Sequence, residues 1–119
     1  MALSLSSIMI GSSRPKALAA FYETVLAKAP DMAEDGWYGW SLGGCFLMIG
    51  RHSEVKGKAK EPQRLMLNFQ SRTARKDAAR IKAAGAKVIK DLYQMEGAWI
   101  ATFADPDGNF FQVMSPWKG

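Results

Sequence analysis

The feature of this sequence that most constrains its fold is an order of strand and helix patterns that occurs twice. In the first half, a strand pattern at 4–10 precedes an amphipathic helix pattern, and β-prone segments follow at 36–42 and 45–49. The second half repeats this order, with segments at 64–70, 73–84, 87–93, 98–104 and 109–114. The halves share little direct identity, so the repeat is one of structure.

Both predicted helices carry start and stop signals. Ser13 is suited to the N-cap of the first helix, and Pro15 to its first turn. Thr73 is a candidate cap for the second, Ala-rich helix, and Gly85 is well placed to end it. The first helix shows one apolar stripe, made of Leu18, Phe21, Tyr22, Val25 and Leu26.

Each half is too small to bury both faces of its sheet alone. Two such sheets packed edge to edge would form a curved surface, with helices on the convex side and a cavity on the concave side. We therefore predict an α+β fold in a single domain, residues 1–119. Its parts are a first module at about 1–50, a charged linker at about 51–63 and a second module at about 64–119.

Charge and composition exclude several classes of protein. The formal net charge is +5, but the Lys and Arg residues are scattered and no nucleic-acid-binding motif accompanies them. The longest apolar runs fall short of the roughly 18 residues that a membrane span needs, and no signal peptide is evident. Cys45 is alone, which excludes an internal disulfide and suits a reducing compartment. We expect a cytoplasmic protein with no nucleic-acid or membrane partner.

The most specific motif, F-A-D-P-D-G-N-F-F-Q-V-M at 103–114, contains a tight turn. Asp105 can accept backbone hydrogen bonds, Pro106 presets φ, and Gly108 supplies a positive φ. The aromatic and β-branched flanks therefore predict a β-hairpin. Gln112 lies in the strand after the turn, and its role matters most for function.

Three segments carry a family resemblance: A-F-Y-E-T-V-L at 20–26, R-I-K-A-A-G-A-K-V at 80–88 and D-P-D-G-N-F-F-Q at 105–112. In this order and spacing, the chain resembles the vicinal oxygen chelate superfamily, also called the glyoxalase/bleomycin resistance/dioxygenase fold. The resemblance covers nearly the whole chain. It implies two βαβββ modules that form a curved mixed sheet around a concave cavity.

The resemblance also implies where a metal would bind. Family enzymes hold a divalent metal in the cavity with His, Glu or Gln from the first and last strands of each module. The matching positions here are Ser7, Met48, Met66 and Gln112. Divalent metals at such sites take carboxylate oxygen or imidazole nitrogen, whereas this set offers one amide and two thioethers. The single histidine, His52, falls in the linker, where we interpret it as an exposed loop residue, so we expect no metal and no other cofactor.

Strand alternation assigns further residues to the cavity. Beside the four positions above, it adds Leu5, Met9, Phe46, Asn68, Phe110 and Met114. The alternate positions are predicted to face the helices as core: Leu47, Ile49, Leu67, Phe69, Phe111 and Val113. An aromatic wall could come from one or more of Trp37, Trp40 and Trp99, for which core or a dimer interface is the alternative. The candidate ligand-binding residues are Ser7, Phe46, Met48, Met66, Asn68, Phe110, Gln112, Trp40 and Trp99.

Three interpretations of function follow. The favoured one is a metal-free small-molecule-binding protein, similar to the antibiotic-sequestering members of the family, that binds an apolar or aromatic ligand as a homodimer. The second is a metal-dependent lyase, isomerase or dioxygenase with a remodelled site. The third is a degenerate module that acts through protein contacts. The sequence assigns no catalytic residue and leans against an enzyme.

Overall fold

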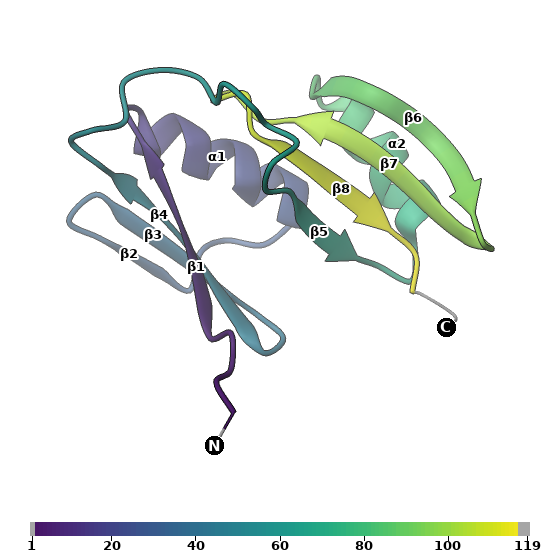
Figure 1. Cartoon of the computed structure of the whole chain (residues 1–119), viewed down its shortest axis with the longest axis horizontal. Helices are drawn as coiled ribbons and strands as arrows, with labels where there is room; N and C mark the ends of the chain where they lie inside the picture. The colour runs from purple at the N-terminus through teal and green to yellow at the C-terminus, as the bar shows by residue number, and fades with distance from the viewer. Residues whose placement is uncertain (1, 117–119) are drawn as a thin grey trace. The chain divides into compact units, whose positions relative to one another are not determined.

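The computed structural model describes residues 2–116, which form two compact units divided between Gly57 and Lys58. Each unit is a four-stranded mixed sheet with one helix (Figure 1). The first unit contains β1 (Ser7–Ser12), α1 (Pro15–Leu26), β2 (Met32–Glu34), β3 (Trp37–Leu42) and β4 (Cys45–Arg51). The second contains β5 (Leu67–Gln70), α2 (Ala74–Ala83), β6 (Lys87–Met95), β7 (Ala98–Ala104) and β8 (Phe110–Met114). This arrangement confirms the α+β class and the βαβββ order of each module.

The two sheets have the same topology. Their strand orders are β1-β4-β3-β2 and β5-β8-β7-β6. In each sheet the first strand runs parallel to the last, and the other neighbours are antiparallel. The structure therefore contains the repeat that the order of sequence patterns predicts.

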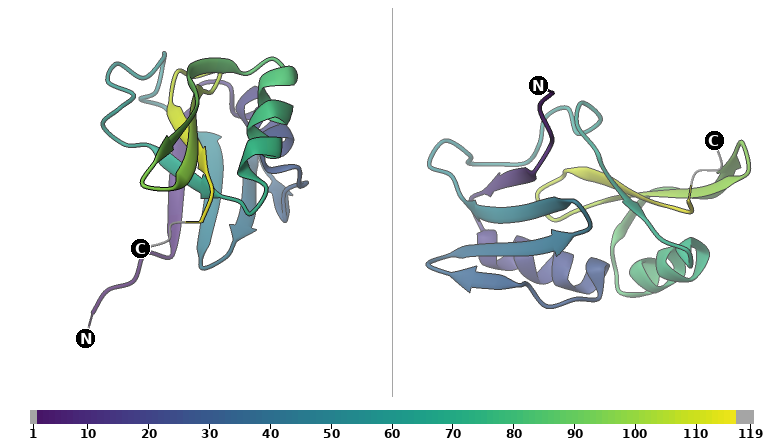
Figure 2. Two further views of the ribbon diagram at one scale, coloured as in Figure 1. Left: turned by 90° about the vertical axis from the view of Figure 1, so that its right-hand side faces the viewer. Right: turned by 90° about the horizontal axis from the view of Figure 1, so that it is seen from below.

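One face of each sheet is covered by the helix of the same module (Figure 2). The first core is formed by Leu18, Tyr22, Val25, Trp40, Leu47 and Ile49, and the second by Ala78, Ile81, Phe103, Phe111 and Val113. Leu67 and Phe69, also predicted as core, are only half-buried. We call the opposite side of each sheet its helix-free face. Within residues 2–116, neither helix is long and apolar enough to cross a membrane.

A serine at the end of a strand prepares the start of each helix. Arg14, not the predicted Ser13, is the N-cap residue of α1, and the hydroxyl of Ser12 accepts the Arg14 N–H at 3.0 Å. Thr73 is the N-cap residue of α2 as predicted, and the hydroxyl of Ser71 accepts the Thr73 N–H at 3.0 Å. Such local bonds hold the backbone in a turn just before the helix.

The predicted turn between β7 and β8 is confirmed in detail. The Gly108 N–H donates to the Asp105 carbonyl at 2.9 Å, and Gly108 has a φ of 83°. The Asp105 carboxylate accepts the N–H groups of Asp107 and Asn109, each at 2.9 Å. The turn therefore fixes the position of Gln112 in β8.

Candidate ligand-binding surfaces

The helix-free face of the first sheet brings several predicted ligand-binding residues together. In the parallel pairing of β1 with β4, Ser7 lies opposite Phe46 and Met9 lies opposite Met48. Paired residues of neighbouring strands share a face. Leu47 and Ile49 each lie one residue away from Phe46 or Met48 in β4. They therefore point to the opposite face, where they are buried.

Two glycines bring aromatic rings against this face. A Cβ atom at Gly50 would lie 2.2 Å from Cε3 of Trp37, and one at Gly39 would lie 2.4 Å from Cε2 of Phe46. Gly39 pairs with Met48, and Gly50 follows Met48 by two residues in β4, so both glycines lie on the same face as Met48. Both rings therefore lie on the helix-free face. The rings cross the neighbouring strands at positions where glycine leaves room for them.

The helix-free face of the second sheet combines polar and apolar groups. Gln112 in β8 lies directly opposite Thr102 in β7, and Nε2 of Gln112 donates to Oγ1 of Thr102 at 3.0 Å. Asn68 in β5 pairs with Gln112 on its other side and is exposed. Phe110 and Met114 flank Gln112 by alternation along β8. The predicted residues Asn68, Phe110 and Gln112 therefore share one face.

Two of the predicted aromatic residues lie on the helix side instead. Trp40 is fully buried in the core, and its Nε1 donates to the Lys28 carbonyl at 2.9 Å. Trp99 lies four residues before the buried Phe103 in β7 and therefore on the same face. The guanidinium of Arg75 in α2 lies 4.8 Å from the centre of the Trp99 ring. The predicted placement of Trp40 and Trp99 beside the other ligand-binding candidates is therefore wrong, because both lie on the face that packs against the helix.

Two other candidates lie outside the strands. The predicted strand at 64–70 begins only at Leu67, so the half-buried Met66 precedes it and alternation does not assign Met66 to a face. Leu5 precedes β1 and is 71% exposed. Trp37, named among the possible wall residues but not among the ligand-binding residues, lies on the helix-free face of the first sheet. Its separation from Trp40 by three residues was the available signal, because an odd separation along a strand changes face.

The side chains at the four positions implied by the resemblance do not fit a divalent cation. Met48 and Met66 carry thioethers, and the Gln112 amide is bonded to Thr102. His52 is half-buried rather than exposed, and its Nδ1 accepts the Glu54 N–H at 3.2 Å. Within residues 2–116, no three His, Cys, Asp or Glu side chains form a group that could hold a metal. The chemistry of this donor set therefore offers no step through a metal.

Each module also has a pocket beside the first turn of its helix. The pocket in the first module has a volume of about 730 Å³, and its charged and aromatic lining includes Arg14, Lys16, Asp35, Tyr38 and Arg51. The pocket in the second module has a volume of about 500 Å³, and its lining includes Arg72, Arg75, Lys76 and Trp99. Both pockets are lined by several cationic side chains.

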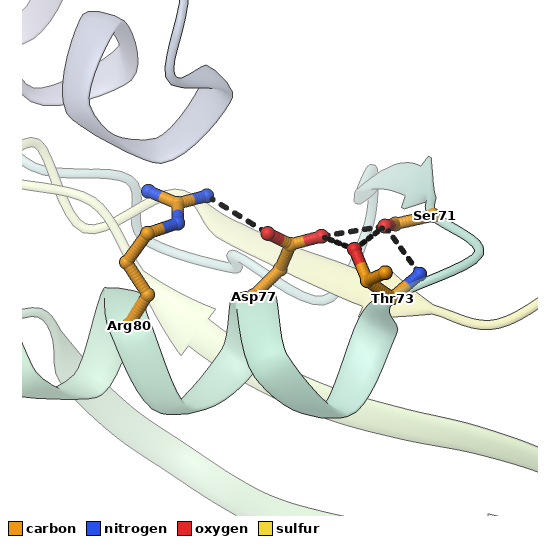
Figure 3. A network of polar contacts seen from close by, with 4 residues as sticks. All are labelled: Ser71, Thr73, Asp77 and Arg80. Carbon is orange, nitrogen blue, oxygen red and sulfur yellow. Dashed lines mark hydrogen bonds and ion pairs between the residues drawn. The ribbon is translucent and has the colours of Figure 1, made fainter.

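A carboxylate of the chain itself occupies the start of α2 (Figure 3). Asp77 Oδ2 accepts hydrogen bonds from the hydroxyls of Ser71 and Thr73, and Asp77 Oδ1 lies 3.4 Å from a guanidinium nitrogen of Arg80. Burial raises the pKa of Asp77, but the two hydroxyls and the Arg80 guanidinium outweigh it, so the pKa lies below its usual value. Asp77 is therefore held as an anion at neutral pH.

A family comparison covers nearly all of the described chain. The sequence model of the Glyoxalase-like domain matches residues 7–114, which run from the first residue of β1 to the last residue of β8. No curated protein matches the sequence.

Solved structures share the fold over almost the full length of the chain. A glyoxalase/bleomycin resistance protein/dioxygenase family enzyme from Burkholderia phytofirmans PsJN is 24% identical, with a TM-score of 0.75 over 95% of this chain and 98% of its own. A glyoxalase/bleomycin resistance protein from Albidiferax ferrireducens T118 is 16% identical, with a TM-score of 0.78 over 95% and 98%. A lactoylglutathione lyase from Agrobacterium tumefaciens is 16% identical, with a TM-score of 0.71 over 94% and 92%. At these identities the likeness concerns the fold.

Proposed function

The chain belongs to the Glyoxalase-like domain family, within the vicinal oxygen chelate superfamily, and we propose that it is a metal-free binding protein for an apolar or aromatic small molecule. The observation that carries this proposal is the hydrogen bond between Gln112 and Thr102. It uses the amide at the position where catalytic relatives commonly present a metal-binding carboxylate. A fold of this kind does not fix a function, which depends on the residues of the site.

The chemistry of the first sheet supports an apolar, partly aromatic ligand. Trp37 and Phe46 place ring surface on the helix-free face, and Met9 and Met48 place flexible, polarisable side chains beside them. Met9 is 53% exposed, so part of this surface is open to a ligand. The second sheet separately carries the amides of Asn68 and Gln112 on its own helix-free face.

Metal analysis of the purified protein tests the metal-free part of the proposal. We expect no stoichiometric Zn, Ni, Mn or Fe, and no thermal stabilisation when these ions are added after chelation. The matched variants are Gln112→Ala and Gln70→Ala, of which the second removes an exposed amide of β5. Stoichiometric metal that Gln112→Ala abolishes and Gln70→Ala leaves in place would overturn the proposal and favour the metal-dependent enzyme.

Binding of a neutral aromatic probe tests the ligand. We expect N-phenyl-1-naphthylamine to bind saturably, with fluorescence enhancement that Met9→Gln weakens. The control is Met95→Gln, the same substitution at a methionine that is 47% exposed, similar to 53% for Met9. Equal binding by native protein and the Met9 variant would remove this face from the proposal. No saturable binding by the native protein would favour a module that acts through protein contacts.

The homodimer expected from the family resemblance belongs to the same proposal. Light scattering on the purified protein tests it, and a monomer at micromolar concentration would contradict it. The measurement should be repeated with the aromatic probe bound, because a ligand that binds the dimer preferentially shifts the equilibrium towards it.

A further inference from the structure

We propose that the pocket beside α1 is a second binding site, which takes a small aromatic carboxylate. This pocket lies beside the start of α1, and of the residues named on the helix-free face only Trp37 also contributes to its lining. Its lining combines three cations, Arg14, Lys16 and Arg51, with the ring of Tyr38, within a volume of about 730 Å³. Pockets of this size accommodate small organic ligands.

The charges around the pocket are unbalanced. The lining contains Arg14, Lys16 and Arg51 but a single carboxylate, from Asp35. Within residues 2–116, no ion pair joins any of the three cations to an acidic side chain. An anion in the pocket would therefore meet donors that no protein carboxylate already engages.

Cations at the start of α1 oppose the helix dipole. The N-terminal end of a helix carries partial positive charge and is stabilised by anions. Arg14 nevertheless occupies the N-cap and Lys16 the first turn, and no acidic residue lies in that turn. A local conflict of this kind is typical of a functional site, where a ligand supplies the missing charge.

The second module shows the contact that the first module lacks. Six residues after Ser71, Asp77 places a carboxylate at the start of α2, where Ser71 and Thr73 donate hydrogen bonds to it. Six residues after the corresponding Ser12, the chain has Leu18, which is fully buried in the core. The start of α1 therefore has no carboxylate of its own, and the cations beside it are left for an anion that enters the pocket.

The apolar part of the lining indicates what the carboxylate is attached to. Beside the cations, the pocket is lined by Pro15, Ala17, Ala20 and Tyr38. A planar ring can pack against Tyr38 while its carboxylate reaches Arg14 or Arg51. In the second module the ring of Trp99 is already covered by Arg75. For this reason the proposal concerns the first pocket.

Titration with sodium benzoate tests the site, with benzamide and sodium chloride as probes that lack the carboxylate or the ring. We expect benzoate to raise the melting temperature progressively as its concentration increases, beyond the effect of sodium chloride at the same ionic strength. Benzoate should also shift the backbone amide resonances of Ser13, Arg14, Lys16, Ala17 and Arg51. The variant R14Q/K16Q should raise the half-saturating concentration by about tenfold or more, because it removes two of the three cations of the lining.

The matched control is R72Q/K76Q, which makes the same change of charge beside the second helix and should leave the benzoate response unchanged. Equal responses to benzoate and benzamide, or equal losses in the two double variants, would overturn the proposal. Resonance shifts confined to the strands of the helix-free faces would also overturn it. Trp37 lines this pocket and also lies on the helix-free face, but R14Q/K16Q leaves it in place. This variant should therefore leave the binding of N-phenyl-1-naphthylamine unchanged, so the two proposals fail separately.

Discussion

Gln112 and Thr102 face each other across β8 and β7, and Nε2 of the Gln112 amide donates to Oγ1 of Thr102 at 3.0 Å. Thr102 is 6% exposed, so its hydroxyl has little access to water as an alternative partner. The bond links Gln112, for which the family resemblance predicts a metal-ligand position, to the adjacent strand. Gln112 therefore has a structural role whether or not a ligand is bound.

Removing this bond should destabilise the fold. We expect Gln112→Ala to lower the free energy of unfolding by about 1 kcal/mol, since it leaves the Thr102 hydroxyl without this partner. Thr102→Val removes the same bond from the other side. Urea unfolding of both single variants and the double variant measures the coupling, which we expect at about 0.5–1.5 kcal/mol.

The variant Gln112→Glu separates structure from metal chemistry. Its carboxylate can accept a hydrogen bond from the Thr102 hydroxyl, so stability at neutral pH should change less than in Gln112→Ala. For the Gln112→Ala and Thr102→Val cycle described above, a coupling near zero would show that the Gln112–Thr102 hydrogen bond contributes nothing to stability in solution. If Gln112→Glu alone made the protein bind a metal, other side chains of the native chain would have to be able to coordinate that metal together with residue 112.

The close contact between Gly50 and the Trp37 ring predicts a strong effect of a single methyl group. The Cβ atom of Gly50→Ala would fall 2.2 Å from the ring, which must move or force the strands apart. We expect a loss of about 1–3 kcal/mol in the free energy of unfolding, as for overpacked sites, with a change in tryptophan fluorescence. Gly44→Ala is the control, because no heavy atom beyond Gly44 and its two chain neighbours lies within 4 Å of its Cβ position. Equal stability of the two variants would contradict the contact.

Much of the fold could be predicted because strong local signals agree with it. Pro15 lies at the start of α1, Gly85 follows α2 with a φ of 99°, and the Asp105 turn precedes β8. The short strand β2 (Met32–Glu34) was not predicted, because three residues carry no measurable alternation. Its place in the sheet depends on pairing with β3, which is a tertiary interaction.

The candidate site was less predictable because a residue's face depends on where its strand begins. Phe46 and Met48 were assigned correctly to one face, since β4 has a clear period of two. Residue type alone groups Trp40 and Trp99 with them, but the positions of these residues in β3 and β7 direct them to the helices. The pocket beside α1 gave no sequence signal, because its lining comes from α1, the turn before β3 and the end of β4.

The lowered pKa of Asp77 predicts that the free energy of unfolding decreases at acid pH. Its folded pKa lies below the ordinary 3.8, so the anion's contribution is fully present above that value and is lost as the pH falls through the folded pKa. We expect Asp77→Asn to be less stable than the native chain by about 1 kcal/mol at pH 7, because the hydrogen bonds to the charged group weaken. Thermal unfolding between pH 7 and about pH 2 should show the two proteins converging at the acid end. The control is Glu61→Gln, which breaks an exposed ion pair with Arg64 and should change stability little at any pH. If the difference in stability between Asp77→Asn and the native chain stayed constant across this range, the ionised Asp77 carboxylate would not be stabilised by the Ser71 and Thr73 hydroxyls.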